Sequence, residues 1–99
     1  MIRGTTPTHV FETDVDLSDA EVLYVTYRQG TIVVEKTKDD CEVTSDSVSV
    51  KLTQKETLLF KAGNYNTEVQ IRARFADGTA VASNTIDLDV SPILKRGEI

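Results

Sequence analysis

Apolar and polar residues alternate one by one along several segments of this chain. Between Ser47 and Leu52 the valines and the leucine share one face, while the serines and the lysine share the other. The same alternation runs through residues 69–75 and 86–90. A strand with one buried and one solvent-exposed face shows this period, which is typical of antiparallel sheets. The pattern therefore predicts an all-β protein.

Two other segments are more continuously apolar. Residues 22–27 and 31–34 are rich in β-branched and aromatic side chains, which fit a pleated surface, and Gln29-Gly30 between them predicts a tight hairpin turn. With shorter strands expected over residues 8–13 and 41–44, the chain has about seven strands at short spacing. This spacing predicts an immunoglobulin-like antiparallel β-sandwich.

Residues 31–36 allow two interpretations. At the border of a sheet, this apolar strand would offer its free backbone edge to another chain. Inside a sheet it would be an ordinary core strand, and we favour that interpretation from the sequence.

Two local motifs predict connections. Asp77-Gly78 fits a two-residue type I′ turn, which needs positive φ at both central positions, so residues 67–76 and 79–90 are expected to form the longest hairpin. Thr53 and Glu56 have the spacing of a capping box, which predicts one short helical turn near residues 54–58.

The length of 99 residues suits a single domain spanning residues 1–99. Residues 1–6 are expected to form an N-terminal arm. Residues 91–99 are expected to form a C-terminal tail that leaves the sheet at Pro92, because proline cannot donate a ladder hydrogen bond.

Charge and cysteine content narrow the function classes. The net charge of −5 argues against nucleic acid as a partner, since phosphate backbones need a basic face. Cys41 is the only cysteine, so no intramolecular disulfide can form, which favours a reducing compartment. No apolar run reaches the length of a signal peptide or a membrane span, so we expect synthesis in a cytoplasm and no membrane insertion.

Gly63 and Tyr65 precede the alternating segment that starts near Thr67. In immunoglobulin-like sandwiches a tyrosine at such a corner packs between two strands and bonds back to nearby backbone through its hydroxyl. We therefore expect a structural role for both residues, with a ligand contact by Tyr65 as the alternative.

Catalytic chemistry has little support in the sequence. His9 is the only histidine, and a nucleophilic pair with Cys41 would need a third orienting group and an oxyanion loop that no motif supplies. Free cysteine is more often a small buried apolar group. We expect no enzyme activity and no cofactor, and His9 is expected to be a strand residue.

Asp14, Asp16 and Asp19 form a short acidic segment. Spaced carboxylates can begin a calcium site, but the glycine and the terminal glutamate of an EF-hand loop are missing. A solvated turn is the favoured interpretation, so no metal is predicted.

A carbohydrate-binding surface would need exposed aromatic rings. Tyr24, Tyr27 and Tyr65 are the candidates, and two of them are expected to pack inside.

Four segments carry a resemblance. Residues 3–9, 52–57, 77–80 and 93–99 resemble small proteins encoded in phages and prophages of Gram-positive bacteria. Residues 52–57 and 62–65 also resemble the small N-terminal β-sandwich of phage upper-baseplate proteins. The resemblance implies an immunoglobulin-like structural or accessory protein of the tail or baseplate region, and it brings no catalytic residue.

The leading hypothesis is a non-catalytic phage or prophage protein that acts through protein–protein assembly. Its partners would be other phage structural proteins or further copies of itself, in the host cytoplasm during synthesis or in the virion. The apolar tail residues Ile93, Leu94 and Ile99 are the expected contacts. A cell-surface carbohydrate-binding module is the alternative, and a small enzyme ranks last.

Overall fold

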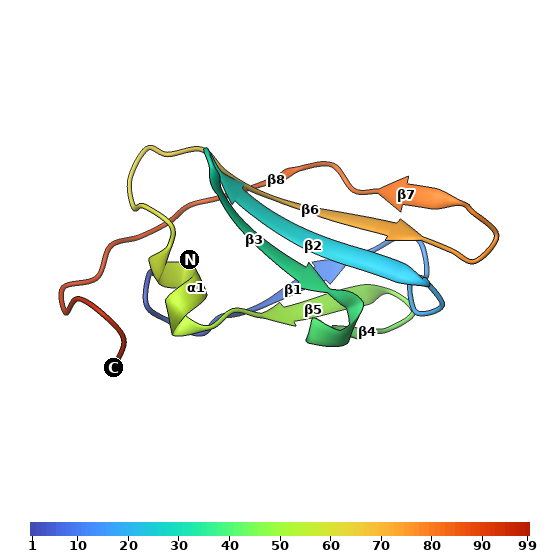
Figure 1. Ribbon diagram of the computed structural model, residues 1–99, viewed down its shortest axis with the longest axis horizontal. Helices are drawn as coiled ribbons and strands as arrows, with labels where there is room; N and C mark the ends of the chain where they lie inside the picture. Colours follow the sequence, from blue (N-terminus) through green and yellow to red (C-terminus); the bar gives the residue numbers. More distant parts are fainter.

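A computed structural model describes all residues, 1–99, as two antiparallel sheets that face each other (Figure 1). One sheet has three strands in the order β1-β5-β4, and the other has the order β3-β2-β6-β7, with β8 also paired to β6. The elements are β1 Thr8–Glu12, β2 Val22–Gln29, β3 Ile32–Thr37, the 3-10 helix η1 Lys38–Asp40, β4 Cys41–Val43, β5 Ser47–Lys51, α1 Gln54–Leu58, β6 Thr67–Arg74, β7 Ala80–Ala82 and β8 Ile86–Leu88. The expected all-β sandwich is confirmed at this level.

The predicted alternation places the core. Val48 and Val50 of β5 are buried, as are Val69, Ile71 and Ala73 of β6. Side chains from both sheets meet in one cluster of fourteen buried apolar residues. Burying apolar surface is the main favourable term in folding, so this cluster holds the two sheets together. The cluster comprises Leu17, Ala20, Leu23, Val25, Tyr27, Val34, Val48, Val50, Leu52, Phe60, Val69, Ile71, Ala73 and Val90.

The hairpin between β2 and β3 has a tight turn as predicted, but the turn is one residue later than the expected Gln29-Gly30. Gln29 pairs with Ile32, which leaves a loop of Gly30 and Thr31. Gly30 has φ of 58°, and a positive φ at the first central position is typical of a type II′ turn.

The favoured interpretation of β3 as a core strand is wrong. β3 lies at one border of the five-stranded sheet, and its Val33 is 52% exposed. The physical reason is the path of the chain, which leaves β3 through η1 and enters β4 in the opposite sheet. No strand of the chain therefore lies beyond β3.

The turn at Asp77-Gly78 is not the predicted type I′ turn. The amide of Gly78 donates to the carbonyl of Phe75 at 2.9 Å, and the amide of Phe75 donates to the carbonyl of Thr79 at 2.8 Å. Gly78 has φ of 91°, whereas Asp77 has no positive φ. The loop thus has three residues, a type I turn followed by a left-handed glycine. The Asp77 carboxylate accepts from the Thr79 amide and stabilises this alternative.

The partner of β6 is broken in the middle. Arg72 pairs with Ala82 and Val69 pairs with Ile86, so three steps along β6 match four steps along the other strand. The extra residue produces a β-bulge at Ser83. There the Ser83 amide donates to the Ile71 carbonyl at 2.9 Å, while the Ser83 hydroxyl accepts from the Ile71 amide at 3.0 Å. The predicted pairing of residues 67–76 with 79–90 is therefore present, but its second strand is divided into two short strands, β7 and β8.

The capping box before α1 is confirmed. The Thr53 hydroxyl accepts from the Glu56 amide at 3.1 Å, and the Glu56 carboxylate accepts from the Thr53 amide at 2.8 Å. None of the helical segments has the length and apolar character of a membrane-crossing helix.

Residues 1–6 do not form a free arm, which corrects the sequence-based expectation. Ile2 makes a parallel bridge with Ser91, just beyond β8, and the Arg3 guanidinium donates to the Leu58 carbonyl. The tail leaves the sheet beside Pro92, as predicted, and extends away from the body of the sandwich (Figure 1). Its last residue returns to α1, where the Gln54 amide bonds to both backbone groups of Ile99.

Candidate interaction site

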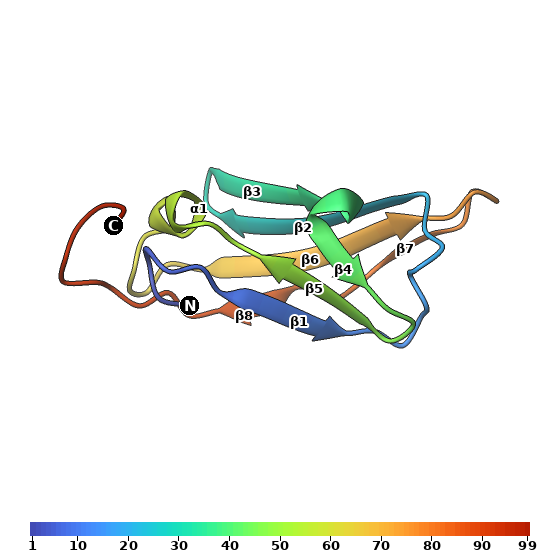
Figure 2. The same cartoon turned by 90° about the horizontal axis from the view of Figure 1, so that it is seen from below.

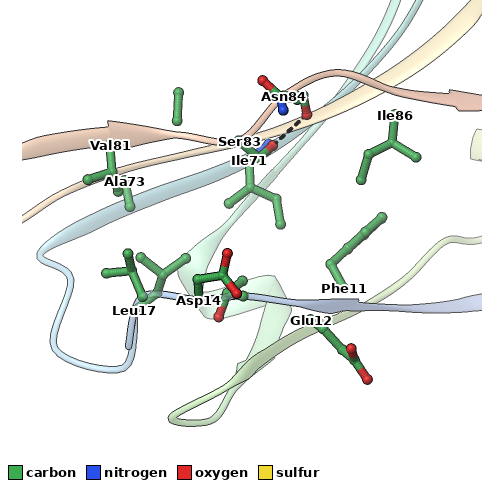
Figure 3. A pocket seen from close by; sticks show the side chains of 13 residues that line it. Phe11, Glu12, Asp14, Leu17, Ile71, Ala73, Val81, Ser83, Asn84 and Ile86 are labelled. Atoms are coloured by element: carbon green, nitrogen blue, oxygen red, sulfur yellow. Dashed lines mark hydrogen bonds between the residues drawn. The ribbon is translucent and has the colours of Figure 1, made fainter.

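A groove opens between the two sheets where β1 faces β7 and β8. It has a volume of about 350 Å³ and thirteen lining residues, eight of them hydrophobic. Figure 3 shows Phe11 of β1 and Ile86 of β8 pointing toward each other across the gap, with Ile71 beside them along the groove. Ile86 is 41% exposed although strand alternation places it on the inner face. Apolar inner surface of the sandwich is therefore open to solvent along this side.

The charged residues that line the groove are all acidic. Glu12 and Asp14 are the charged lining residues, and no lysine, arginine or histidine joins them. Figure 3 shows Asp14 pointing into the gap, whereas Glu12 points away on the other side of β1. An apolar wall with carboxylates on both sides of its border favours a segment that carries apolar and basic residues.

The backbone of β1 has a free edge at this groove. β1 pairs with β5 alone, and the amides of Thr13 and Leu52 bond across that pair to Asp46 and Pro7. Residues of an antiparallel pair alternate between facing the partner and facing away. The amides and carbonyls of Thr8, Val10 and Glu12 therefore face away from β5 and are available to a further strand. Val10 is 62% exposed.

The same alternation frees part of β7. The Phe75 amide bonds to Thr79 and the Ser83 amide bonds to Ile71, so odd-numbered residues of this strand face β6. The backbone groups of Ala80 and Ala82 face outward. Met1 to Arg3 occupy the same border farther along, where the amide of Arg3 donates to the Ser91 carbonyl and the amide of Ser91 donates to the Met1 carbonyl.

The tail presents the predicted apolar residues unequally. Leu94 is fully exposed and Ile99 is 91% exposed. Ile93 is partly buried and lies close to Gly4, so it anchors the start of the tail rather than offering a free contact. Lys95 and Arg96 follow Leu94 directly.

Tyr65 does not form the predicted tyrosine corner. Its side chain is 52% exposed, its hydroxyl makes no hydrogen bond, and its ring lies 5.4 Å from the Lys61 ammonium. Phe60 is fully buried against Tyr27, so the core is filled before the chain reaches Tyr65. Gly63 lies in the preceding loop, where its amide donates to the Val90 carbonyl.

The side chain of Gln29 links the end of β2 to Lys61 and to Thr67, a contact that the sequence did not reveal. Its buried amide donates to the Lys61 carbonyl and to the Thr67 hydroxyl, each at 2.8 Å, and it accepts from the Lys61 amide at 2.8 Å. A glutamine in an apolar strand is a weak signal, because its partners lie more than thirty residues away.

His9 and Cys41 are not brought together as a pair. They lie on β1 and β4, each opposite Val50 of the intervening β5. Nδ1 of His9 shares a 2.7 Å hydrogen bond with the Tyr27 hydroxyl, and burial lowers the pKa of His9. Burial, with a contribution from Asp40, raises the pKa of the Cys41 thiol, which keeps it protonated and poorly nucleophilic.

The acidic segment forms a turn and not a converging cluster. Asp16 accepts from both the hydroxyl and the amide of Ser18, and these hydrogen bonds lower its pKa. Asp14 faces the groove. Nowhere in the structure do three His, Cys, Asp or Glu side chains come close enough together to hold a metal ion.

The tyrosines do not form a joint aromatic surface. Of the three tyrosines, Tyr27 alone is buried in the core, so the expectation that two of them pack inside is wrong. Tyr24 and Tyr65 are exposed, but they line different surface depressions. Tyr24 lies on β2, whereas Tyr65 lies in the loop before β6.

Comparison of the chain with protein-family models, curated proteins and solved structures produced no match.

Proposed function

We propose that this protein is a non-catalytic assembly module that joins protein subunits through the free edges of its sheets. The observation that carries the proposal is the open side between β1 and β7, where unpaired backbone borders apolar inner surface. Edge backbone supplies hydrogen bonds to an added strand, and an adjoining apolar groove supplies side-chain specificity. The exposed Leu94 and Ile99 add a projecting contact at the opposite end.

The strand order supports an immunoglobulin-like assignment. If β1 is taken as strand B, the sheets β1-β5-β4 and β3-β2-β6-β7 have the orders B-E-D and C′-C-F-G of immunoglobulin sandwiches. The short helix α1 then occupies the E-F connection. Such sandwiches host many unrelated functions, so the fold by itself does not specify the partner.

The partner class in this proposal comes from the resemblance in the sequence. It points to the tail or baseplate region of phages and prophages of Gram-positive bacteria, with other structural proteins or further copies as partners. Extended edges and projecting tails suit such repeated assemblies, because contacts between different surfaces of identical subunits generate rings or filaments.

The test is fractionation of cells that carry the gene, before and after prophage induction. An antibody to the protein would follow it through a density gradient, with cross-linking of each fraction. We expect the protein to sediment with particles or with their assembly intermediates, and to cross-link there to structural subunits. A protein that stays at monomer mass without cross-links in every fraction would contradict the proposal.

A carbohydrate screen is the matched control experiment. Binding of a glycan that is lost in either Tyr24→Ala or Tyr65→Ala would favour the carbohydrate-binding alternative. Absence of glycan binding together with particle association would retain the assembly module.

A further inference from the structure

We propose that the groove between β1 and β7 accepts the C-terminal tail of a second copy of this chain, around Leu94 to Arg96. This inference rests on the proposed assembly function and names its partner. The contact joins the groove of one copy to the tail of the next, so its two halves lie on different surfaces. Such a heterologous contact builds rings or open chains of subunits rather than a closed symmetric pair.

The chemistry of the two surfaces is complementary. The groove offers an apolar wall of Phe11, Ile71 and Ile86, and its charged lining residues, Glu12 and Asp14, are both acidic. The tail offers one exposed leucine followed by two basic residues. Unlike charges at the border of an interface steer association and fix the register.

Strand alternation matches these groups in space. In an extended segment, Leu94 and Arg96 share one face and Lys95 lies on the other. With Leu94 directed at the apolar wall, Arg96 faces the same side as Asp14, which points into the gap (Figure 3). Lys95 then lies on the outer side with Glu12, which points away from the gap (Figure 3).

The backbone can complete the contact. The free amides and carbonyls of Thr8, Val10 and Glu12 lie along the groove and can pair with an added strand. The chain already uses strand addition on the facing border of the five-stranded sheet, where Ile2 pairs in parallel with Ser91 just beyond β8. An added tail would pair in a comparable way with the open border of β1.

The arrangement of the chain favours a second copy over the chain's own tail. The tail starts at Ser91 and runs away from β7, toward the end of the molecule that holds α1 (Figures 1 and 2). Its last residue is held there by Gln54. The tail of one molecule therefore projects at one end, whereas the groove faces out near the other.

The experiment measures self-association of the full-length protein by sedimentation equilibrium over a concentration series. The groove variant is Ile86→Glu, and the tail variant combines Lys95→Glu with Arg96→Glu. We expect each to weaken association at least tenfold. Val33→Glu is the matched control, because Val33 is similarly exposed but lies on β3 at the opposite border, and we expect it to leave association unchanged.

Two further experiments test whether the groove of one copy contacts the tail of another: mixing the two variants, and reversing the charges on both surfaces. The Ile86→Glu protein retains a tail, and the tail variant retains a groove, so an equimolar mixture should form one-to-one pairs and no larger species. Glu12→Lys with Asp14→Lys should weaken association on its own, and it should regain association when combined with the two tail substitutions. Glu12 and Asp14 are exposed, so these variants test the contact even if Ile86→Glu disturbs folding.

The outcomes separate this inference from the assembly function. Association that survives both the groove and the tail variants, or that is lost in Val33→Glu, overturns the groove–tail contact. A monomer at every concentration also overturns it. If such a monomer still sediments with particles after induction, the assembly function stands, whereas a monomer without particle association removes both.

Discussion

The two long sides of the sandwich are closed in different ways. On one side the chain passes from β3 through η1 into β4, so a covalent connection crosses between the sheets, and Lys36 of β3 reaches Glu56 of α1 at 2.8 Å. On the other side β1 and β7 face each other without a connecting strand, and the groove lies between them. Stability should therefore be concentrated near α1 and β3, while the β1–β7 side is available for contacts with other molecules.

The largest difference between the sides should appear when one large apolar side chain is removed from each. Phe60 is fully buried beside Tyr27, so Phe60→Ala should lower the free energy of unfolding by about 3–5 kcal/mol. Ile86→Ala, in the groove, should lose only about 1 kcal/mol because much of its surface is already in water. Urea unfolding followed by circular dichroism measures both, and equal losses would contradict the distinction.

Replacing Gln29 tests how much its buried hydrogen bonds to Lys61 and Thr67 contribute to stability. Gln29→Leu leaves the Lys61 amide and carbonyl and the Thr67 hydroxyl without their partner, at about 1–3 kcal/mol for each group that stays buried. We expect a total loss of about 2–4 kcal/mol in urea unfolding. Gln70→Leu is the control, since Gln70 makes one bond to the Ser83 carbonyl on the open side. A loss for Gln70→Leu as large as that for Gln29→Leu would refute the assignment of Gln29 as an anchor.

The Lys36–Glu56 pair, on the side where η1 connects the two sheets, should make the stability of the protein depend on pH. Burial alone would raise the pKa of Glu56, but its bonds to Lys36 and Thr53 outweigh burial and lower the pKa. The stabilisation is therefore fully present above the ordinary glutamate value, about 4.3, and is lost as the pH falls through the lowered pKa.

Glu56→Gln should cost about 1–2 kcal/mol at pH 7 and reduce the loss of stability below pH 4. Urea unfolding at several pH values measures this. Glu21→Gln is the control, because the Glu21–Arg74 pair is 4.0 Å apart and exposed. An unchanged acid profile in Glu56→Gln would assign that loss to other carboxylates.

The titration of His9, which lies on β1 between the two sheets, should have the smallest effect on stability. Burial lowers its pKa, so the folded protein favours the neutral ring that bonds to Tyr27. The unfolded chain takes up a proton first as the pH falls below about 6.5, and stability should decline from there down to the lowered pKa.

His9→Gln should remove that step, while Tyr27→Phe keeps the histidine and loses only its partner. Because His9 is the only histidine, its NMR titration reports the folded pKa without overlap. A titration midpoint at or above 6.5 would contradict the expected direction.

The local features of the fold could be predicted from the sequence, and the long-range ones could not. Alternation in β5 and β6 and the Thr53–Glu56 capping box depend on residues a few positions apart, and the structure confirms them. The loop at Asp77-Gly78 differs because its length depends on the register of β7 against β6. The position of β3 at a border depends on where the next strand pairs, which no property of residues 31–36 specifies.

The candidate site was missed for the same reason. Phe11 and Ile86 are 75 positions apart by sequence number, and each is an ordinary inner-face residue of its own strand. They become a groove only because the border of one sheet is packed beside the border of the other. The exposed tail residue Leu94 could be identified from the sequence because the sheet ends before it at Pro92, whereas the packing of its neighbour Ile93 near Gly4 is a long-range contact that the sequence does not reveal.

The bulge at Ser83 also bears on solubility. Long, flat, unpaired borders allow proteins to stack without limit into amyloid fibrils, and natural sheets interrupt such borders with bulges. Here the one-residue offset separates two strands, β7 and β8, of three residues each. An added chain can keep register with only one of them at a time. The border can therefore accept a short peptide segment while resisting uncontrolled aggregation.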